Sequence, residues 1–198
     1  MKQAPRYSNQ RVGIFVDVQN LYHSAKNLYH GRVNYQELIK YLLQGRKLIR
    51  VTAYVVKSEG TANEPIEAKA ANAPIATNGE TQSREHAGRS SEASFFEALS
   101  SAGIELRIKD LQIFHGGMKK ADWDVGMAVD TIRKANFLDT IILVTGDGDF
   151  VPLVEYLKWG LGKQVEVAAF GRTVSGRLKE IADVFLNIED IPKVILKK

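Results

Sequence analysis

Short runs rich in β-branched and aromatic residues alternate along this chain with amphipathic segments of helical spacing. The runs that we predict as strands cover residues 11–17, 47–56, 104–114, 139–147, 164–171 and 183–190. Helices are predicted between them, at residues 21–29, 34–43, 91–103, 121–137, 149–160 and 175–182. Strands that alternate with helices form parallel βαβ units with right-handed crossovers. The alternation therefore predicts an α/β fold, a three-layer α/β/α sandwich around a mainly parallel sheet.

The chain has 198 residues, which is enough for one globular domain with additional loops or tails. We expect a polar N-terminal tail at residues 1–10, a single domain over 11–190 and a basic C-terminal tail at 191–198. Residues 57–90 lack aromatics and any sustained apolar period, so they cannot bury enough surface to offset their ordering entropy. They are predicted to be a flexible insertion, and any second copy or protein partner is expected to bind there.

The composition excludes several classes of protein. No apolar run approaches the roughly 18 residues of a membrane span, and the polar start "MKQAPRYSNQ" lacks the pattern of a secretory signal. The absence of Cys excludes disulfides and thiolate metal sites. We therefore expect a cytoplasmic protein that does not act at a membrane.

Two aspartates, Asp147 and Asp149, follow the most apolar predicted strand in the stretch "TGDGDF". A single Asp there would simply cap the next helix. Two of them need a further reason, and we expect Gly146 and Gly148 to let the backbone bend so that both carboxylates face one pocket. Parallel sheets bind ligands beyond the carboxyl ends of their strands, near the point where the strand order reverses. Because Asp17 ends the first strand, it is expected to meet this pair there.

A further carboxylate, Asp124, begins a predicted helix that should start at the same edge of the sheet. Carboxylates gathered in a partly buried site raise each other's pKa unless a cation neutralises them. Hard oxygen ligands without Cys favour Mg²⁺ or Mn²⁺. Such ions support phosphodiester hydrolysis, since they activate water and stabilise the phosphate charge. The residues thus predict a metal-dependent phosphodiesterase.

Four stretches in a fixed order carry a likeness to a known family. They are "IFVDVQNLY", "KKADWDVGMAVD", "ILVTGDGDFVPLV", and "GKQVEVAAF" followed by "SGRLKEIADVFL", and they span nearly the whole chain apart from the insertion and the two ends. In this combination the chain resembles the NYN domains, specifically their LabA-like branch, which are relatives of the PIN nucleases. The resemblance implies a PIN-like (Rossmann-like) topology, an acidic metal site and a ribonuclease activity, with single-stranded RNA as the expected substrate.

The resemblance also implies roles for individual residues. Carried over by matching position, Asp17, Asp124, Asp147 and Asp149 are the catalytic and metal-binding residues. Asn20 matches the polar residue that follows the first of these aspartates in the family.

Three further residues are supporting candidates near this set. Asp122 lies close to Asp124 in the sequence, and Asp130 lies six residues beyond Asp124. Six residues leave Asp130 about 120° off the same helix face, so we expect it only in an outer shell. Thr145 either contributes a hydroxyl beside the metal or is an ordinary strand residue.

The charge distribution suits a polyanion partner. The formal net charge is +4, of which residues 57–92 carry −2 and the remainder +6. Four basic residues are predicted at the carboxyl edge of the sheet, where they would either hold an RNA backbone or be solvated surface charges: Lys119, Lys120, Arg172 and Arg177. Trp123 and Phe150 flank acidic positions, and we expect core packing for them rather than stacking on bases.

Other kinds of site fit these residues less well. A calcium loop would need oxygen ligands where Val151 and Lys158 stand, and a phosphatase with an Asp nucleophile would need a second Asp in place of Gln19. No phosphate-binding P-loop motif occurs. The four histidines show no ligand spacing and are predicted to lie on the surface or in loops: His23, His30, His86 and His115.

A function of another class is the alternative, namely a regulatory RNA-binding or scaffold module that keeps the fold and has little catalytic turnover. The insertion and the basic C-terminal segment would suit such a module. The carboxylates favour the enzyme, because a protein that only binds a polyanion gains nothing from four clustered negative charges.

Overall fold

The structure is a computed structural model that describes residues 7–57, 93–110, 112–113, 119–120 and 123–197. Its central sheet has six strands in the order β4-β3-β1-β7-β8-β9, and all neighbouring strands in it are parallel. The strands are β1 (Arg11–Asp17), β3 (Lys47–Lys57), β4 (Glu105–Asp110), β7 (Thr140–Val144), β8 (Gln164–Ala169) and β9 (Val184–Asn187). β3 and β4 lie on one side of β1, whereas β7, β8 and β9 lie on its other side. The strand order therefore reverses between β1 and β7.

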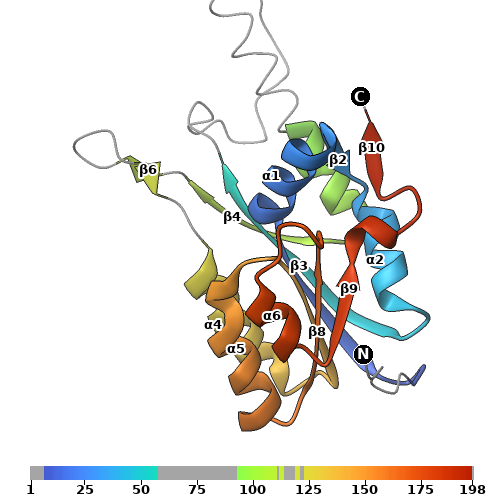
Figure 1. Cartoon of the computed structure of the whole chain (residues 1–198), viewed down its shortest axis with the longest axis vertical. Coiled ribbons are helices and arrows are strands. Elements are labelled where there is room, and N and C mark those ends of the chain that lie inside the picture. The colour runs from blue at the N-terminus through green and yellow to red at the C-terminus, as the bar shows by residue number, and fades with distance from the viewer. Residues whose placement is uncertain (1–6, 58–92, 111, 114–118, 121–122, 198) are drawn as a thin grey trace, which may run out of the picture.

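Helices cover both faces of the sheet, so the fold has three layers (Figure 1). One face carries α1 (Val18–Tyr29), α2 (Tyr35–Leu43) and a helix at residues 93–101, and the other carries α4 (Asp124–Ala135), α5 (Val151–Glu155) and α6 (Gly176–Ile181). This arrangement confirms the predicted α/β/α sandwich with a parallel sheet.

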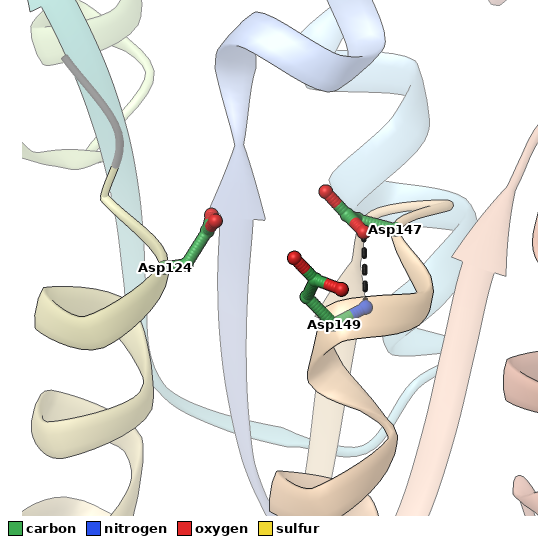
Figure 2. A group of neighbouring side chains, drawn as sticks. All are labelled: Asp124, Asp147 and Asp149. Carbon is green, nitrogen blue, oxygen red and sulfur yellow. Dashed lines mark hydrogen bonds between the residues drawn. The ribbon is translucent and has the colours of Figure 1, made fainter. Parts of the chain in front are cut away.

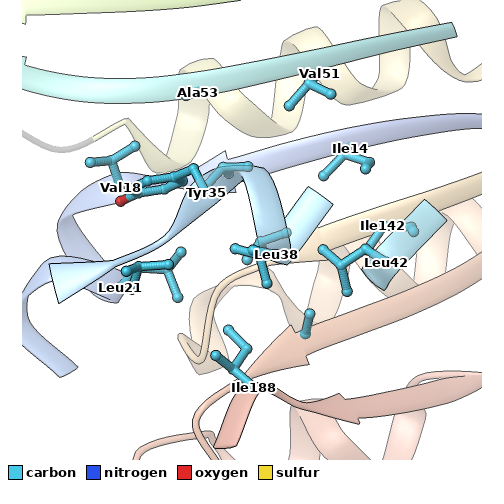
Figure 3. Packing of buried hydrophobic residues seen from close by; sticks show 14 of the residues in the cluster. Ile14, Val18, Leu21, Tyr35, Leu38, Leu42, Val51, Ala53, Ile142 and Ile188 are labelled. Carbon is cyan, nitrogen blue, oxygen red and sulfur yellow. The ribbon is translucent and has the colours of Figure 1, made fainter. Parts of the chain in front are cut away.

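Each face of the sheet has its own hydrophobic core, because successive residues of a strand point to opposite sides. In β1, Ile14 and Val16 belong to the core beneath α1 and α2, whereas Phe15 belongs to the core beneath α4, α5 and α6. Figure 3 shows the first of these cores, where Leu21 of α1 and Leu38 of α2 pack among the strand side chains. Both cores hold the carboxyl ends of the strands in fixed positions.

Two of the helices, α1 and α2, begin at a residue whose side chain caps them. The side chain of Asn34 accepts a hydrogen bond from the backbone N–H of Glu37 at 3.3 Å and thereby caps α2. Asp17 caps α1 in the same way, and Pro152 lies in the first turn of α5, where its missing N–H costs little.

The predicted helix at 149–160 is divided into three pieces. A 3₁₀ turn, η1 (Gly148–Phe150), leads into α5, and a π-helical segment, η2 (Tyr156–Gly160), follows. The backbone N–H of Leu161 donates to the carbonyl of Tyr156 at 3.1 Å, five residues earlier, as a π-helix requires. The predicted strand at 104–114 is also divided, since β4 ends at Asp110 and β5 (Gln112–Ile113) pairs with β6 (Lys119–Lys120) in a separate ribbon.

The C-terminal segment packs on the domain, which differs from the tail that we expected at 191–198. Ile191 and Val194 are buried in the core beneath α1 and α2. Beyond them, β10 (Ile195–Lys197) pairs antiparallel with β2 (Gly31–Val33). Ile191 and Val194 drive this packing, and the described basic residues that suggested a tail, Lys193 and Lys197, are exposed.

The predicted insertion at 57–90 lies outside the described residues except for Lys57, and most of the predicted N-terminal tail does as well. Among the helices that the structure describes, none has the length and apolar character needed to cross a bilayer.

Candidate functional site

The candidate site lies at the carboxyl ends of β1 and β7, where the strand order reverses. Asp17 is the last residue of β1, and the turn that carries Asp147 and Asp149 begins directly after β7. Because β1 and β7 are neighbours in the sheet, these segments lie side by side. This is the position at which open parallel sheets bind their ligands.

Three carboxylates come together at this edge, and we call Asp124, Asp147 and Asp149 the acidic cluster. One carboxylate oxygen of each lies within 4.8 Å of the corresponding oxygens of the others. Figure 2 shows that Asp124 reaches the cluster from the first turn of α4, while Asp147 and Asp149 reach it from the turn after β7. The backbone N–H of Asp149 donates to Oδ1 of Asp147 at 3.0 Å, so Asp147 also caps η1.

Asp17 is not one of these three, although it was predicted to join them. Its Oδ1 accepts a hydrogen bond from the N–H of Asn20 at 3.0 Å, and its Oδ2 accepts one from the hydroxyl of Thr145 at 3.2 Å. Burial raises the pKa of Asp17, these hydrogen bonds oppose that rise, and the nearby charge of Asp147 adds to it. Asp17 therefore lies beside the acidic cluster as a half-buried carboxylate that links the end of β1 to α1 and to the residue that follows β7.

Asn20 and Thr145 hold the turn that carries the two aspartates. Oδ1 of Asn20 accepts a hydrogen bond from the N–H of Gly146 at 2.9 Å, and Oγ1 of Thr145 accepts one from the N–H of Asp147 at 3.2 Å. Thr145 is fully buried. Both residues thus contact the backbone of the turn, and Thr145 contacts Asp17 as well.

The glycines of the turn serve close packing, and the predicted reason for them was wrong. Neither Gly146 nor Gly148 has a positive φ. A Cβ on Gly148 would lie 2.9 Å from Oγ of Ser175, and a Cβ on Gly146 would lie 3.2 Å from the carbonyl oxygen of Thr173. The loop before α6 therefore lies against this turn, and larger residues at either position would push the two apart.

A cleft of about 330 Å³ opens beside the acidic cluster, and we call it the α1 cleft. Its lining includes Asp17, Asp124 and Asp147, one face of α1, and an aromatic wall: Asp17, Gln19, Asn20, His23, Ser24, Asn27, Tyr54, Val56, Trp123, Asp124, Asp147 and Thr173. The α1 residues of this lining beyond Asn20 were not predicted from the sequence. The helical spacing of Asn20, His23 and Asn27 was the signal, because residues three and four apart share a face.

The prediction of core packing holds for both aromatic residues, and one of them also lines the cleft. Phe150 packs in the core beneath α4 and α5, as expected. Trp123 packs against the same core, and its indole N–H donates to the carbonyl of Val55 at 2.9 Å, yet it also lines the α1 cleft. Of the four histidines, His23 and His30 are exposed on α1 and at its C-cap, and the other two lie outside the described residues.

Asp130 lies away from the acidic cluster. Its Oδ2 accepts a hydrogen bond from the hydroxyl of Tyr54 at 3.2 Å and forms an ion pair with Arg107 at 3.5 Å. Burial, reinforced by the charge of Asp130, raises the pKa of Tyr54 above its usual range. Asp130 thus contacts Tyr54, which lines the cleft, and Asp122 lies outside the described residues.

The predicted RNA-binding cations are spread around this edge of the sheet. Nε of Arg172 lies 3.3 Å from Oε1 of Glu189, and a guanidinium nitrogen of Arg177 lies 3.5 Å from Oε1 of Glu155, with both arginines largely exposed. Lys119 and Lys120 form β6, and their side chains are outside what the structure describes.

The acidic cluster has the donors of a hard divalent cation. Three carboxylates within reach of one ion match the ligands that Mg²⁺ and Mn²⁺ take, and the ion would relieve the repulsion among them. Within the described residues, neither Asp147 nor Asp149 forms an ion pair with Lys or Arg. The residues present therefore fit a metal ion.

Three comparisons relate the chain to known proteins. The family model for the NYN domain matches residues 11–189. Over 111 residues the chain is 29% identical to the Low amplitude and bright protein LabA of Synechococcus elongatus, a match that spans 52% of this chain and 58% of that relative. A crystal structure of a protein of unknown function from Vibrio parahaemolyticus is 28% identical, with a TM-score of 0.71, and the match covers 98% of this chain and all of that one.

Proposed function

This chain belongs to the NYN domain family, and on that premise we propose that it is a metal-dependent ribonuclease that hydrolyses phosphodiester bonds of single-stranded RNA. NYN domains are a PIN-like nuclease family, which supports a nuclease or RNA-related role. The observation that carries the proposal is the acidic cluster at the switch point of the sheet. In a protein that only bound RNA, three carboxylates facing the phosphates would lower the affinity for RNA.

Asp124, Asp147 and Asp149 would hold the cation, with Mg²⁺ or Mn²⁺ as the expected metal. When bound, such an ion supplies charge stabilisation for the phosphate and lowers the pKa of a water ligand. Because Oδ1 of Asp147 already accepts a hydrogen bond from the N–H of Asp149, the orientation of that carboxylate is fixed before the substrate binds. Asp149 is the most exposed of the three and is the residue that we assign to orient the attacking water.

The remaining candidate residues position this set. Asp17 acts from beside the cluster, where its charge reaches Asp147, and Thr145 and Asn20 hold the turn. Lys119, Lys120, Arg172 and Arg177 are proposed to contact the RNA backbone. For Arg172 and Arg177 this requires the phosphates to compete with Glu189 and Glu155, which is easy at such exposed positions.

A cleavage assay tests the proposal. End-labelled single-stranded RNA, RNA duplex and single-stranded DNA are incubated with Mg²⁺, with Mn²⁺ and with EDTA. We expect metal-dependent cleavage of single-stranded RNA by the wild type and none by Asp147→Asn. Asp190→Asn is the matched control, since Asp190 is an exposed aspartate outside the cleft, and it should cleave normally.

Two results would contradict this function. If the wild type binds RNA without cutting it under any metal, the RNA-binding or scaffold module becomes the better description. If Asp147→Asn cuts at the wild-type rate, the carboxylate serves only as a helix cap.

A further inference from the structure

The acidic cluster forms a ridge between two hollows. On one side lies the α1 cleft, and on the other lies a second hollow of about 540 Å³ between α4 and α5, which we call the α4–α5 groove. Asp124 lines both, so the two hollows meet at the cluster. The groove is lined by Asp124, Val125, Ala128, Ile132, Asp149, Phe150, Pro152, Leu153 and Tyr156.

The α4–α5 groove has a chemical character opposite to that of the cluster. Its charged lining residues are Asp124 and Asp149, at the end that meets the cluster, and the rest of the lining is apolar or aromatic. Val125 is 75% exposed and Tyr156 is 48% exposed. Contiguous apolar surface that faces solvent marks a binding surface. Tyr156 is also the first residue of the π-helical segment, and such segments are frequent at functional sites.

We propose that the α4–α5 groove binds a base of an unpaired RNA strand, on the opposite side of the acidic cluster from the α1 cleft. This inference rests on the proposed ribonuclease function. The lining suits an occupant that is uncharged and can pack on an aromatic ring inside the groove, and that carries negative charge where the groove meets the cluster and its cation. A nucleotide has both properties, with its base on Tyr156 and its phosphate at Asp124 and Asp149. A paired base could not enter, because its faces are covered by its neighbours in the duplex.

The two hollows then differ in what they recognise. The α1 cleft exposes Gln19, His23 and Asn27, whose side chains can hydrogen-bond to base edges. The groove offers Tyr156 and aliphatic side chains, and stacking on them tolerates every base. We therefore expect the α1 cleft to determine any base preference of the protein, and the groove to bind every base equally well.

Tyr156→Ala tests the groove, with Trp159→Ala as its control. Trp159 belongs to the same π-helical segment and is 68% exposed, but it does not line the groove. Binding of fluorescein-labelled phosphorothioate octamers of uridylate and of adenylate, which resist hydrolysis, is measured by anisotropy with Mn²⁺ present and Asp147 unchanged. Tyr156→Ala should bind both octamers about tenfold more weakly, because one base stack is lost. Trp159→Ala and Tyr156→Phe should bind them with the wild-type affinity.

A second measurement separates this inference from the proposed function. Hydrolysis of bis(p-nitrophenyl) phosphate by the wild type with Mn²⁺ present tests the chemistry of the acidic cluster without RNA. If the wild type hydrolyses neither this ester nor RNA, the ribonuclease proposal fails, while the comparison of octamer affinities still decides the groove.

Two outcomes would overturn the groove assignment. The first is equal octamer affinity for Tyr156→Ala and Trp159→Ala. The second is a wild-type protein that elutes as a dimer in size-exclusion chromatography and becomes a monomer on Tyr156→Ala, which would show that a second copy covers the groove.

Discussion

Asp147 serves both the fold and the candidate site, so the helix-cap and metal-ligand interpretations of this residue are not alternatives. Its Oδ1 caps η1 by accepting the N–H of Asp149, and the same side chain belongs to the acidic cluster. An ionised carboxylate has about four acceptor positions on two oxygens, so the cap uses only part of its capacity. Asn at this position would keep the cap and lose the charge, which makes Asp147→Asn a clean test of the site.

The first prediction concerns metal and stability. Millimolar Mg²⁺ or Mn²⁺ should raise the melting temperature of the wild type relative to EDTA, because the ion binds the native state only. At a concentration about tenfold above Kd the gain is roughly 1.4 kcal/mol, which is a few degrees for a chain of this size. Asp147→Asn and Asp149→Asn should lose the shift in differential scanning fluorimetry, and Asp190→Asn should keep it. An equal shift in all four proteins would argue against metal at the acidic cluster.

The second prediction concerns Thr145, whose hydroxyl links two functional segments. Thr145→Val keeps the shape but leaves the N–H of Asp147 without its acceptor and Asp17 without one donor. The free energy of unfolding should fall by about 1–3 kcal/mol in urea titrations. Thr131→Val is the matched control, since that buried hydroxyl only donates back to the carbonyl of Met127 within α4, and it should cost less. Equal costs would mean that the Thr145 contacts add nothing to stability.

At the scale of the elements, the sequence was most informative where local pattern and core packing agree. The strands at Arg11–Asp17 and Thr140–Val144 are almost uninterrupted apolar runs, so their position was clear before the structure was known. The division of residues 148–160 into 3₁₀, α and π pieces was not predictable. These helix types differ in whether each N–H donates to the carbonyl three, four or five residues earlier, and the apolar pattern of the sequence does not distinguish them. The C-terminal segment was misread because its lysines masked the buried Ile191 and Val194.

The candidate site was partly predictable for a similar reason. Strand ends and the parallel topology placed Asp17, Asp147 and Asp149 at one edge, which a pattern can show. The position of Asp17 outside the acidic cluster was not predictable, because its side chain accepts hydrogen bonds from the N–H of Asn20 and the hydroxyl of Thr145, which no spacing reveals. The role of Gly146 and Gly148 depends on the loop before α6, some thirty residues away in the chain.

The third prediction concerns the ion pair at the amino edge, which ties β1 to β7 opposite the site. Arg11 donates to both carboxylate oxygens of Asp139, and these bonds lower the pKa of Asp139 to about 2. Since this lies below the ordinary Asp value of about 3.9, the pair stabilises the fold above pH 4 and loses its effect as the pH falls from 4 to 2. Asp139→Asn should therefore unfold at lower urea than the wild type at pH 7, with a smaller gap at pH 3.

That prediction has an internal control, because Asp190→Asn removes a carboxylate without a comparable partner. Its urea midpoint relative to the wild type should not change between the two pH values. A gap for Asp139→Asn that stays constant from pH 7 to pH 3 would mean that the ion pair is worth nothing in solution, which is common for exposed pairs.

At the scale of the whole molecule, the chain closes on itself, because its last strand returns to the segment that follows α1. β10 pairs with β2, and the N–H of Asn34 donates to the carbonyl of Val194 at 2.7 Å, so the C-terminal segment supports the start of α2 as well. Through α1 and α2 this contact reaches the core that includes Val18 and Leu21, the sequence neighbours of Asp17 and Asn20. Stability of the site is thus coupled to residues far from it.

The fourth prediction follows from this closure. Truncation after Asp190 removes the buried Ile191 and Val194 and unpairs β2, and burial of two such side chains is worth roughly 3–6 kcal/mol. The urea midpoint should fall sharply, and the metal-induced thermal shift should weaken because α1 is no longer held. Truncation after Leu196 keeps both buried residues and should behave almost as the wild type. If the chain truncated after Asp190 has the urea midpoint of the wild type, the segment is a tail in solution, and the core beneath α1 and α2 is complete without it.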